Sequence, residues 1–225
     1  MRELEVRRLG VVGYEEALAL QRHLVEERRA ARVPDLLLLL QHPPAITLGV
    51  KGDGGRANIV ATSDRLAALG IAVHETGRGG DVTYHGPGQI VGYPIVDLRP
   101  DRCDVHRYVR DLEEVMIRVC ADYGVSADRI KGLTGAWVGA EKIGAIGVRI
   151  SRWITSHGFA FNVSTDLDHF RLIVPCGISD RGVTSLEHAS GRRVAIVDVE
   201  DALVRRFAET FERRVTSDLP VAASA

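Results

Sequence analysis

The chain has 225 residues, enough for one domain that buries roughly 70% of the surface its unfolded form exposes. Hydrophobic residues make up 45% and charged residues 26%, and 29 basic side chains nearly balance 30 acidic ones. These proportions exclude a disordered, fibrous or membrane-spanning protein and provide no overall positive charge for nucleic-acid binding. We expect a cytoplasmic protein, because three cysteines show no pairing pattern and the charged N-terminus lacks a signal peptide's apolar core.

Hydrophobic periodicity predicts strands and helices in irregular succession. Strands are expected over residues 4–9 (an edge strand), 36–40 (buried on both faces), 45–50, 71–76, 82–84 and 90–98, followed by an antiparallel run over 135–163. Helices are expected over residues 14–32, 63–70, 104–123 and 198–215. This order predicts a single α+β domain over residues 1–215, with a mixed, largely antiparallel sheet flanked by helices, and a disordered tail over 216–225.

A glycine-rich segment, residues 76–89 (TGRGGDVTYHGPGQ), is the first candidate for a functional site. Six of its fourteen residues are Gly or Pro, and they surround Arg78, Tyr84 and His85. Glycines let the backbone approach a ligand and leave N–H groups free to donate to it. The simpler interpretation is a pair of tight turns, but so many glycines around three functional side chains favour a binding role.

Cys176 and Lys142 are the candidate reactive side chains. Cys176 ends an apolar run between Pro175 and Gly177, where a turn would present its sulfur, whereas Cys120 shares a helical face with apolar residues and is interpreted as core. Lys142 is one of only three lysines and opens a strand of small residues, although strand-end lysines usually reach solvent. A partly desolvated lysine has a lowered pKa and can lower the pKa of a nearby thiol.

These residues together suggest acyl transfer through a thioester. Glycines at 144 and 147 leave room for a slender ligand beside a second strand, residues 157–162 (HGFAFN). A thiolate is a good nucleophile near neutral pH, and transfer from sulfur to an amine is favourable because an amide is more stable than a thioester. ATP is not required, in agreement with the absence of a Gly-x-x-x-x-Gly-Lys phosphate loop. No motif has metal-ligand spacing, so neither a metal nor a cofactor is expected.

Five segments in this order resemble the lipoyl(octanoyl) transferase family, which moves octanoyl from acyl carrier protein to a lysine of lipoyl domains. They are residues 41–49 (QHPPAITLG), 78–89 (RGGDVTYHGPGQ), 142–147 (KIGAIG), 157–162 (HGFAFN) and 175–178 (PCGI). The resemblance covers about residues 4–206 and implies the fold of the catalytic domain of biotin and lipoate protein ligases. It implies octanoyl-acyl carrier protein as donor. The implied acceptors are lipoyl domains of 2-oxoacid dehydrogenase complexes and the glycine cleavage H protein, with no nucleic acid or membrane as partner.

The resemblance also implies roles for individual residues. Cys176 would hold the acyl thioester, and Lys142 would lower its pKa and shuttle protons. The fatty chain would contact Arg78, Gly79, Gly80, Asp81, Val82, Thr83, Tyr84 and His85, then Ala145, Ile146 and Gly147, then Gly158, Phe159 and Ala160. Backbone N–H groups of the first segment would face a developing oxyanion, and His157 and Asn162 would be second-rank polar contacts. Because both partners are acidic, we expect an arginine-rich face, with candidates Arg56, Arg78, Arg149 and Arg152.

Three other functions stay open at the level of sequence. An ATP-dependent lipoate or biotin protein ligase on the same scaffold would use Lys142 to hold an acyl-adenylate and would make Cys176 incidental. A non-catalytic fatty-acyl binding module would need neither side chain. A cysteine hydrolase would need a histidine base and a path for water, and it would release free octanoate.

Overall fold

The computed structural model describes residues 1–51, 56–174 and 181–219. Its strands are β1 (Arg2–Val11), β2 (Asp35–Gln41), β3 (Ala45–Leu48), β4 (Ala72–Glu75), β5 (Thr83–His85), β6 (Gln89–Ile95), β7 (Asp128–Ile130), β8 (Leu133–Val138), β9 (Glu141–Ser151), β10 (Ile154–Asn162) and β11 (Arg213–Leu219). Its helices are α1 (Tyr14–Arg29), α2 (Ser63–Ala68), α3 (Val105–Asp122), α4 (Leu186–Ser190) and α5 (Ile196–Phe211), with 3-10 turns η1 (Arg56–Asn58) and η2 (Leu167–Leu172). Within these ranges no helix is long and apolar enough to cross a membrane.

The strands form two sheets, one of eight strands and one of three. The large sheet has the order β11-β1-β2-β6-β10-β9-β8-β7 and the small sheet the order β4-β3-β5. In the large sheet, β11, β1 and β2 are parallel neighbours, and all other neighbours are antiparallel. The predicted α+β fold with a mixed, largely antiparallel sheet is therefore confirmed, as is the antiparallel run of β8, β9 and β10.

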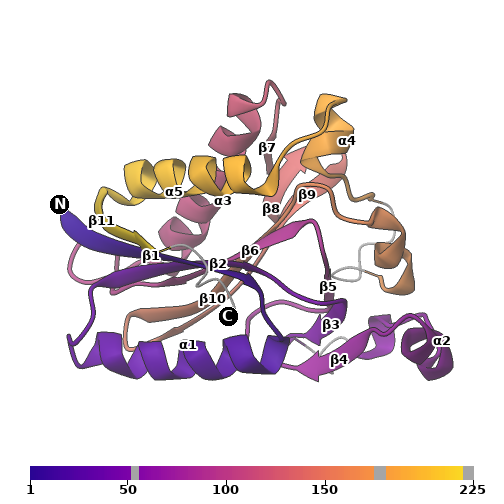
Figure 1. Ribbon diagram of the computed structural model, residues 1–225, viewed down its shortest axis with the longest axis horizontal. Helices are drawn as coiled ribbons and strands as arrows, with labels where there is room; N and C mark the ends of the chain where they lie inside the picture. Colours follow the sequence, from indigo (N-terminus) through magenta and orange to yellow (C-terminus); the bar gives the residue numbers. More distant parts are fainter. Residues whose placement is uncertain (52–55, 175–180, 220–225) are drawn as a thin grey trace.

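The five leucines of β2 show how the helices cover both faces of the large sheet. Leu37 and Leu39 pack in one core with residues of α3 and α5, and the other three leucines pack in a second core with residues of α1. Figure 1 shows α1 on one face of the sheet and α3 with α5 on the other. Alternate side chains of a strand point to opposite faces, so a continuous apolar run is needed where both faces are covered. The prediction for 36–40 is confirmed.

Helix starts agree closely with their sequence signals. Asp104 caps α3, as predicted, and its carboxylate accepts hydrogen bonds from the backbone N–H groups of His106 and Arg107 at 2.8 and 3.1 Å. Helix α2 is capped one residue earlier than expected, by Thr62 rather than Ser63. Cys120 is fully buried on α3 in the core, as expected, and burial raises the pKa of its thiol to about 12.

The C-terminal segment differs from prediction. Helix α5 ends at Phe211, where Glu212 adopts a left-handed φ of 53°, and the chain continues as β11. Strand β11 pairs in parallel with β1, so the expected tail is wrong for residues 216–219, while 220–225 lie outside the described residues. The same pairing means that β1 is an interior strand and β11 lies outside it at the edge.

The glycine turn after His85 connects the two sheets. The strands predicted on either side of it are present, but β5 pairs with β3 in the small sheet and β6 pairs with β2 and β10 in the large one. Figure 1 shows the small sheet beside the end of α1. In the segment before the turn, the N–H of Gly79 donates to the carbonyl oxygen of Val148 in β9, so the start of this segment lies against the large sheet.

Candidate functional site

A cavity of about 440 Å³ lies between the two sheets. Most of the predicted binding residues line it, together with groups that the sequence did not single out. The lining includes Tyr14, Arg78, Gly79, Gly80, Asp81, Val82, Thr83, His85, Gln89, Tyr93, Lys142, Ala145, Ile146, Gly147, His157, Gly158, Phe159, Ala160 and Asn162. Segments far apart in sequence thus converge on one space.

Tyr84 is the exception among the predicted lining residues. Its hydroxyl lies 2.8 Å from Nδ1 of His169, and its ring packs edge-on against Phe170 at 5.5 Å between centroids. These contacts belong to the core of the small sheet, and burial raises the pKa of Tyr84 to about 12. The prediction that Tyr84 faces the acyl chain is therefore wrong. Alternate side chains of a strand point to opposite faces, and in β5 it is Thr83 and His85 that point into the cavity.

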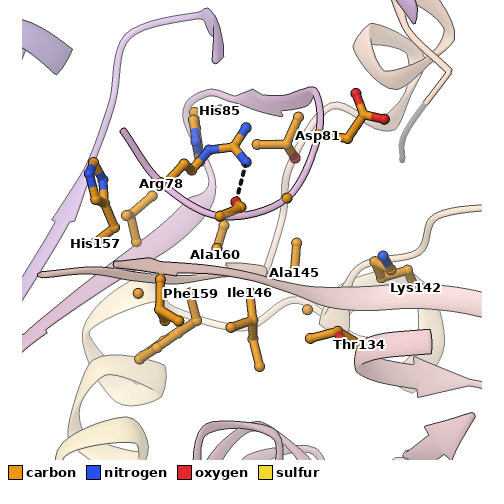
Figure 2. A pocket seen from close by; sticks show the side chains of 18 of the residues that line it. Arg78, Asp81, His85, Thr134, Lys142, Ala145, Ile146, His157, Phe159 and Ala160 are labelled. Carbon is orange, nitrogen blue, oxygen red and sulfur yellow. Dashed lines mark hydrogen bonds between the residues drawn. The ribbon is translucent and has the colours of Figure 1, made fainter. Parts of the chain in front are cut away.

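Small residues of β9 and β10 form the floor of the cavity. Figure 2 shows Ile146 and Phe159 extending from the face of these strands opposite to Arg78 and His85, and Phe159 packs in the core with α3 and α5. A Cβ added at Gly147 would lie 3.0 Å from both Cδ of Arg78 and the carbonyl oxygen of Gly79. Glycine at 147 thus lets Arg78 and the backbone of Gly79 pack directly against β9.

Arg78 forms part of the roof. Its side chain is buried, and its guanidinium donates to the carbonyl oxygen of Thr47 at 2.6 Å and to the Thr47 hydroxyl at 3.0 and 3.2 Å. The expectation that Arg78 contributes to a surface for acidic partners is wrong for this reason. The other three candidates for that surface are all exposed: Arg56, Arg149 and Arg152.

The backbone of the 78–83 loop is largely used to hold the loop in place. The N–H of Gly79 donates to the carbonyl oxygen of Val148 in β9 at 2.9 Å, and the N–H of Val82 donates to the Asp81 carboxylate at 2.6 Å. The same carboxylate accepts two hydrogen bonds from the side-chain amide of Asn58. Neither Gly79 nor Val82 therefore has an N–H available for an oxyanion.

His85 and His157 are buried and uncharged at neutral pH. Burial lowers the pKa of His85 well below its usual value, and Nδ1 of His85 donates to Oε1 of Gln89 at 2.7 Å. Burial, with Arg78 nearby, lowers the pKa of His157 to about 4. His157 has a left-handed φ of 54°, and its N–H donates to Oε1 of Gln21 at 2.8 Å, while its buried Nδ1 has no partner among the described residues.

Three further residues with polar groups, near His85 and His157, were not predicted. Nδ1 of His42 donates to the carbonyl oxygen of Val12 at 2.7 Å, so its Nε2 accepts from the Tyr93 hydroxyl, also at 2.7 Å. The ring of Tyr14 lies 5.1 Å from that of His42 and 6.1 Å from that of His85. His42 belongs to the segment 41–49 that carried part of the resemblance, which is the one signal that could have identified it. Tyr14 and Tyr93 had no such signal.

Lys142 lines the cavity at the start of β9, where the register with β8 shifts. Such a bulge redirects a side chain relative to the regular strand. The backbone of Lys142 donates to Gly182 and accepts from Thr184, both at 3.0 Å, and its Nζ lies 4.7 Å from the centre of the Trp137 ring. Figure 2 shows Lys142 and His157 at opposite ends of the floor.

Cys176 lies outside the described residues, as do Pro175, Gly177 and Ile178. The described chain on both sides of this segment lines the cavity, at Phe170 before it and at Val183 after it.

The comparisons with known proteins identify the family. Residues 13–208 match the model of the lipoyl protein ligase A/B catalytic domain. The chain belongs to this family. It is 50% identical to an octanoyltransferase of Solibacter usitatus over the full length of both proteins. It is 51% identical to an octanoyltransferase of Myxococcus xanthus, over 98% of this chain and 63% of that longer protein.

The solved structures support the fold. A bipartite lipoate protein ligase from Thermoplasma acidophilum, solved in work on the enzyme and its E2 lipoyl domain, superposes with a TM-score of 0.74. That match covers 99% of this chain and 89% of the other at 20% identity, so it shows a shared fold. The identity of 50–51% to octanoyltransferases makes this chain an acyltransferase that transfers octanoyl groups in protein lipoylation, and the resemblance seen in the sequence is confirmed.

Proposed function

We propose that the chain transfers octanoyl from octanoyl-acyl carrier protein to a lysine of lipoyl domains through a thioester on Cys176. The observation that supports this most is Lys142 at one end of a cavity with a floor of alanine and glycine. A floor without bulky side chains suits an unbranched alkyl chain, which gains about 0.8 kcal/mol for each buried methylene. The lipoyl domains of 2-oxoacid dehydrogenase complexes and the glycine cleavage H protein are the acceptors.

The proposed reaction has two steps with the same chemistry. The Cys176 thiolate attacks the carbonyl carbon of the donor thioester, the new C–S bond forms, and the donor sulfur leaves as a thiolate that takes a proton. The acceptor amine then attacks the acyl-enzyme carbonyl, an amide C–N bond forms, and the Cys176 thiolate leaves. Lys142 takes the proton lost by the thiol or amine and returns it to the leaving sulfur, and as an ammonium it favours the thiolate.

The backbone contacts of Lys142 support its proposed role with Cys176. Its backbone hydrogen bonds tie β9 to Gly182 and Thr184, which follow that segment directly. In the sequence Cys176 lies two positions after Val174 and six before Gly182, and Val174 is itself anchored, its N–H donating to the carbonyl oxygen of Asn58 at 2.7 Å. A transferase that uses this pair differs from an ATP-dependent ligase because its acyl group arrives already activated as a thioester.

The proposal is tested by mass spectrometry of the intact protein after incubation with octanoyl-acyl carrier protein in the absence of ATP. We expect a mass increase of one octanoyl group that hydroxylamine removes, loss of this adduct in Cys176→Ala, and slower adduct formation in Lys142→Ala. Cys103→Ser is the matched control, because Cys103 is exposed and remote in sequence from the motifs, and it should keep the adduct. Transfer to a lipoyl domain by Cys176→Ala at the normal rate would contradict thioester chemistry.

A further inference from the structure

A line of hydrogen bonds connects the roof of the cavity to the strand of Lys142. It begins at Arg78, which donates to the hydroxyl of Thr47. That hydroxyl lies 3.3 Å from Nε2 of His85. Because Nδ1 of His85 donates to Gln89 and the ring is neutral, Nε2 accepts the Thr47 proton. Each of these groups donates to the next in the same direction.

The side-chain amides of Gln89 and Asn162 continue the line. Nε2 of Gln89 donates to the carbonyl oxygen of Tyr84 at 3.1 Å and to Oδ1 of Asn162 at 3.0 Å. Nδ2 of Asn162 donates to the carbonyl oxygen of Thr184 at 3.0 Å. A carbonyl oxygen can only accept, so these contacts fix which end of each amide carries the nitrogen. Gln89 and Asn162 are 2% and 5% exposed, so water cannot readily replace either bond.

The line ends at the backbone of Lys142. The N–H of Thr184 donates to the carbonyl oxygen of Lys142 at 3.0 Å, and the N–H of Lys142 donates to Gly182. Asn162 is therefore the side chain that connects β10 to the short segment pairing with Lys142. That segment directly follows the residues that contain Cys176 in the sequence.

We propose that Asn162, held by Gln89, is a positioning residue for the reaction: its amide fixes residues 182–184 and through them the backbone of Lys142 at the end of the cavity. This inference rests on the proposed function, since it concerns the same lysine. The effect of Asn162 is transmitted through the backbone of Thr184, and it should alter the rate of acyl transfer more than the binding of the acyl donor.

Two variants separate this role from a general effect on folding. Asn162→Asp keeps the oxygen that accepts from Gln89 and loses the donor to Thr184. Asn162→Ala, the matched control, loses both groups and adds no titratable group. At pH 8 we expect kcat for octanoyl transfer to a lipoyl domain to fall about tenfold or more in both variants, because each loses at least the buried hydrogen bond to Thr184. KM for the donor should change less than about twofold.

The pH dependence provides the decisive readout. Burial raises the pKa of a carboxyl group, and the new carboxyl of Asn162→Asp, once protonated, would regain a donor for the Thr184 carbonyl. The ratio of kcat for Asn162→Asp to that of the unmodified protein should therefore rise several-fold between pH 8 and pH 6, whereas the ratio for Asn162→Ala should stay constant. A ratio for Asn162→Asp that does not change with pH, or kcat values within about twofold of the unmodified protein, would overturn the inference.

Two further measurements keep the result interpretable. Thermal unfolding establishes that each variant folds, and if Asn162→Asp does not fold, the kcat and KM of Asn162→Ala decide alone by the same criteria. Alkylation of Cys176 by iodoacetamide requires no octanoyl donor, and it should be about fivefold slower or more in the variants if Lys142 is displaced. Unmodified protein that forms no octanoyl adduct would refute the proposed function, while alkylation rates equal in all three proteins would refute the role of Asn162.

Discussion

At the scale of single residues, the lack of a side chain at Gly147 determines how closely Arg78 and its loop approach the floor of the cavity. Gly147 lies beneath Arg78, and a methyl group there would have to sit 3.0 Å from the backbone oxygen of Gly79. That oxygen belongs to a loop held to β9 by the bond from Gly79 to Val148, so it cannot easily retreat. A Gly147→Ala substitution must therefore displace Arg78 and change the shape of the cavity.

We expect Gly147→Ala to raise KM for the octanoyl donor about tenfold, because overpacking of this kind costs about 1–3 kcal/mol. Steady-state kinetics with octanoyl-acyl carrier protein measures the effect. Gly13→Ala is the matched control, since a Cβ at Gly13 meets nothing within 4 Å and its φ of −57° suits any residue. Equal KM values for the two variants would show that the position of Arg78 does not affect binding of the octanoyl donor.

Strand geometry explains which site residues the sequence could identify and which it could not. The motif 78–85 names consecutive residues, but β5 directs Thr83 and His85 into the cavity and Tyr84 into the core on the other side. Ile146 still lines the cavity, but it extends from the face of β9 opposite to Arg78. A motif thus locates the segment, whereas the face of each side chain follows from strand register, which depends on the partner strand.

At the scale of secondary-structure elements, local signals were reliable and distant pairings were not. The start of α3 was predictable because Asp104 acts within three residues, and β2 because its leucines are contiguous. Strand β11 was not predictable, since residues 213–219 gain their conformation by pairing with β1, at the opposite end of the chain. The assignment of β5 and β6 to different sheets depends on similarly distant partners.

A buried ion pair between Arg213 and Asp35 anchors β11, and its contribution to the stability of the fold can be tested. Arg213 donates to Asp35 at 2.8 Å, with the two side chains 2% and 1% exposed, and Arg28 pairs with the second oxygen of the same carboxylate. Removing one partner leaves a buried charge incompletely compensated, so Arg213→Ala should lower the free energy of unfolding by about 3 kcal/mol. Urea denaturation measures this. Its neighbour Arg214 pairs with Glu3 on the surface, and Arg214→Ala should cost about 0.5 kcal/mol or less.

At the scale of the whole molecule, the site exists because two sheets meet around a cavity. The roof comes from the small sheet and its loop, the floor from β9 and β10, and the aromatic and histidine side chains fill the junction. His42, His85 and His157 all have a lowered pKa, with burial as the main cause. The junction is therefore built from neutral imidazoles, and protonation opposes its packing.

This arrangement predicts a loss of stability in acid that can be assigned to one histidine. The unfolded chain binds a proton to His157 near pH 6.5, but the folded protein does so only near pH 4, so stability falls as the pH decreases through this window. The shift corresponds to about 3 kcal/mol at pH 4. In His157→Asn, which tolerates the left-handed φ of 54°, urea denaturation should show a weaker decrease between pH 7 and pH 4 by about that amount. The fully exposed His106 provides the control, and the stability of His106→Asn should depend on pH as that of the unmodified protein does. If the stability of His157→Asn instead decreased in parallel with that of the unmodified protein, the acid sensitivity would lie at other groups.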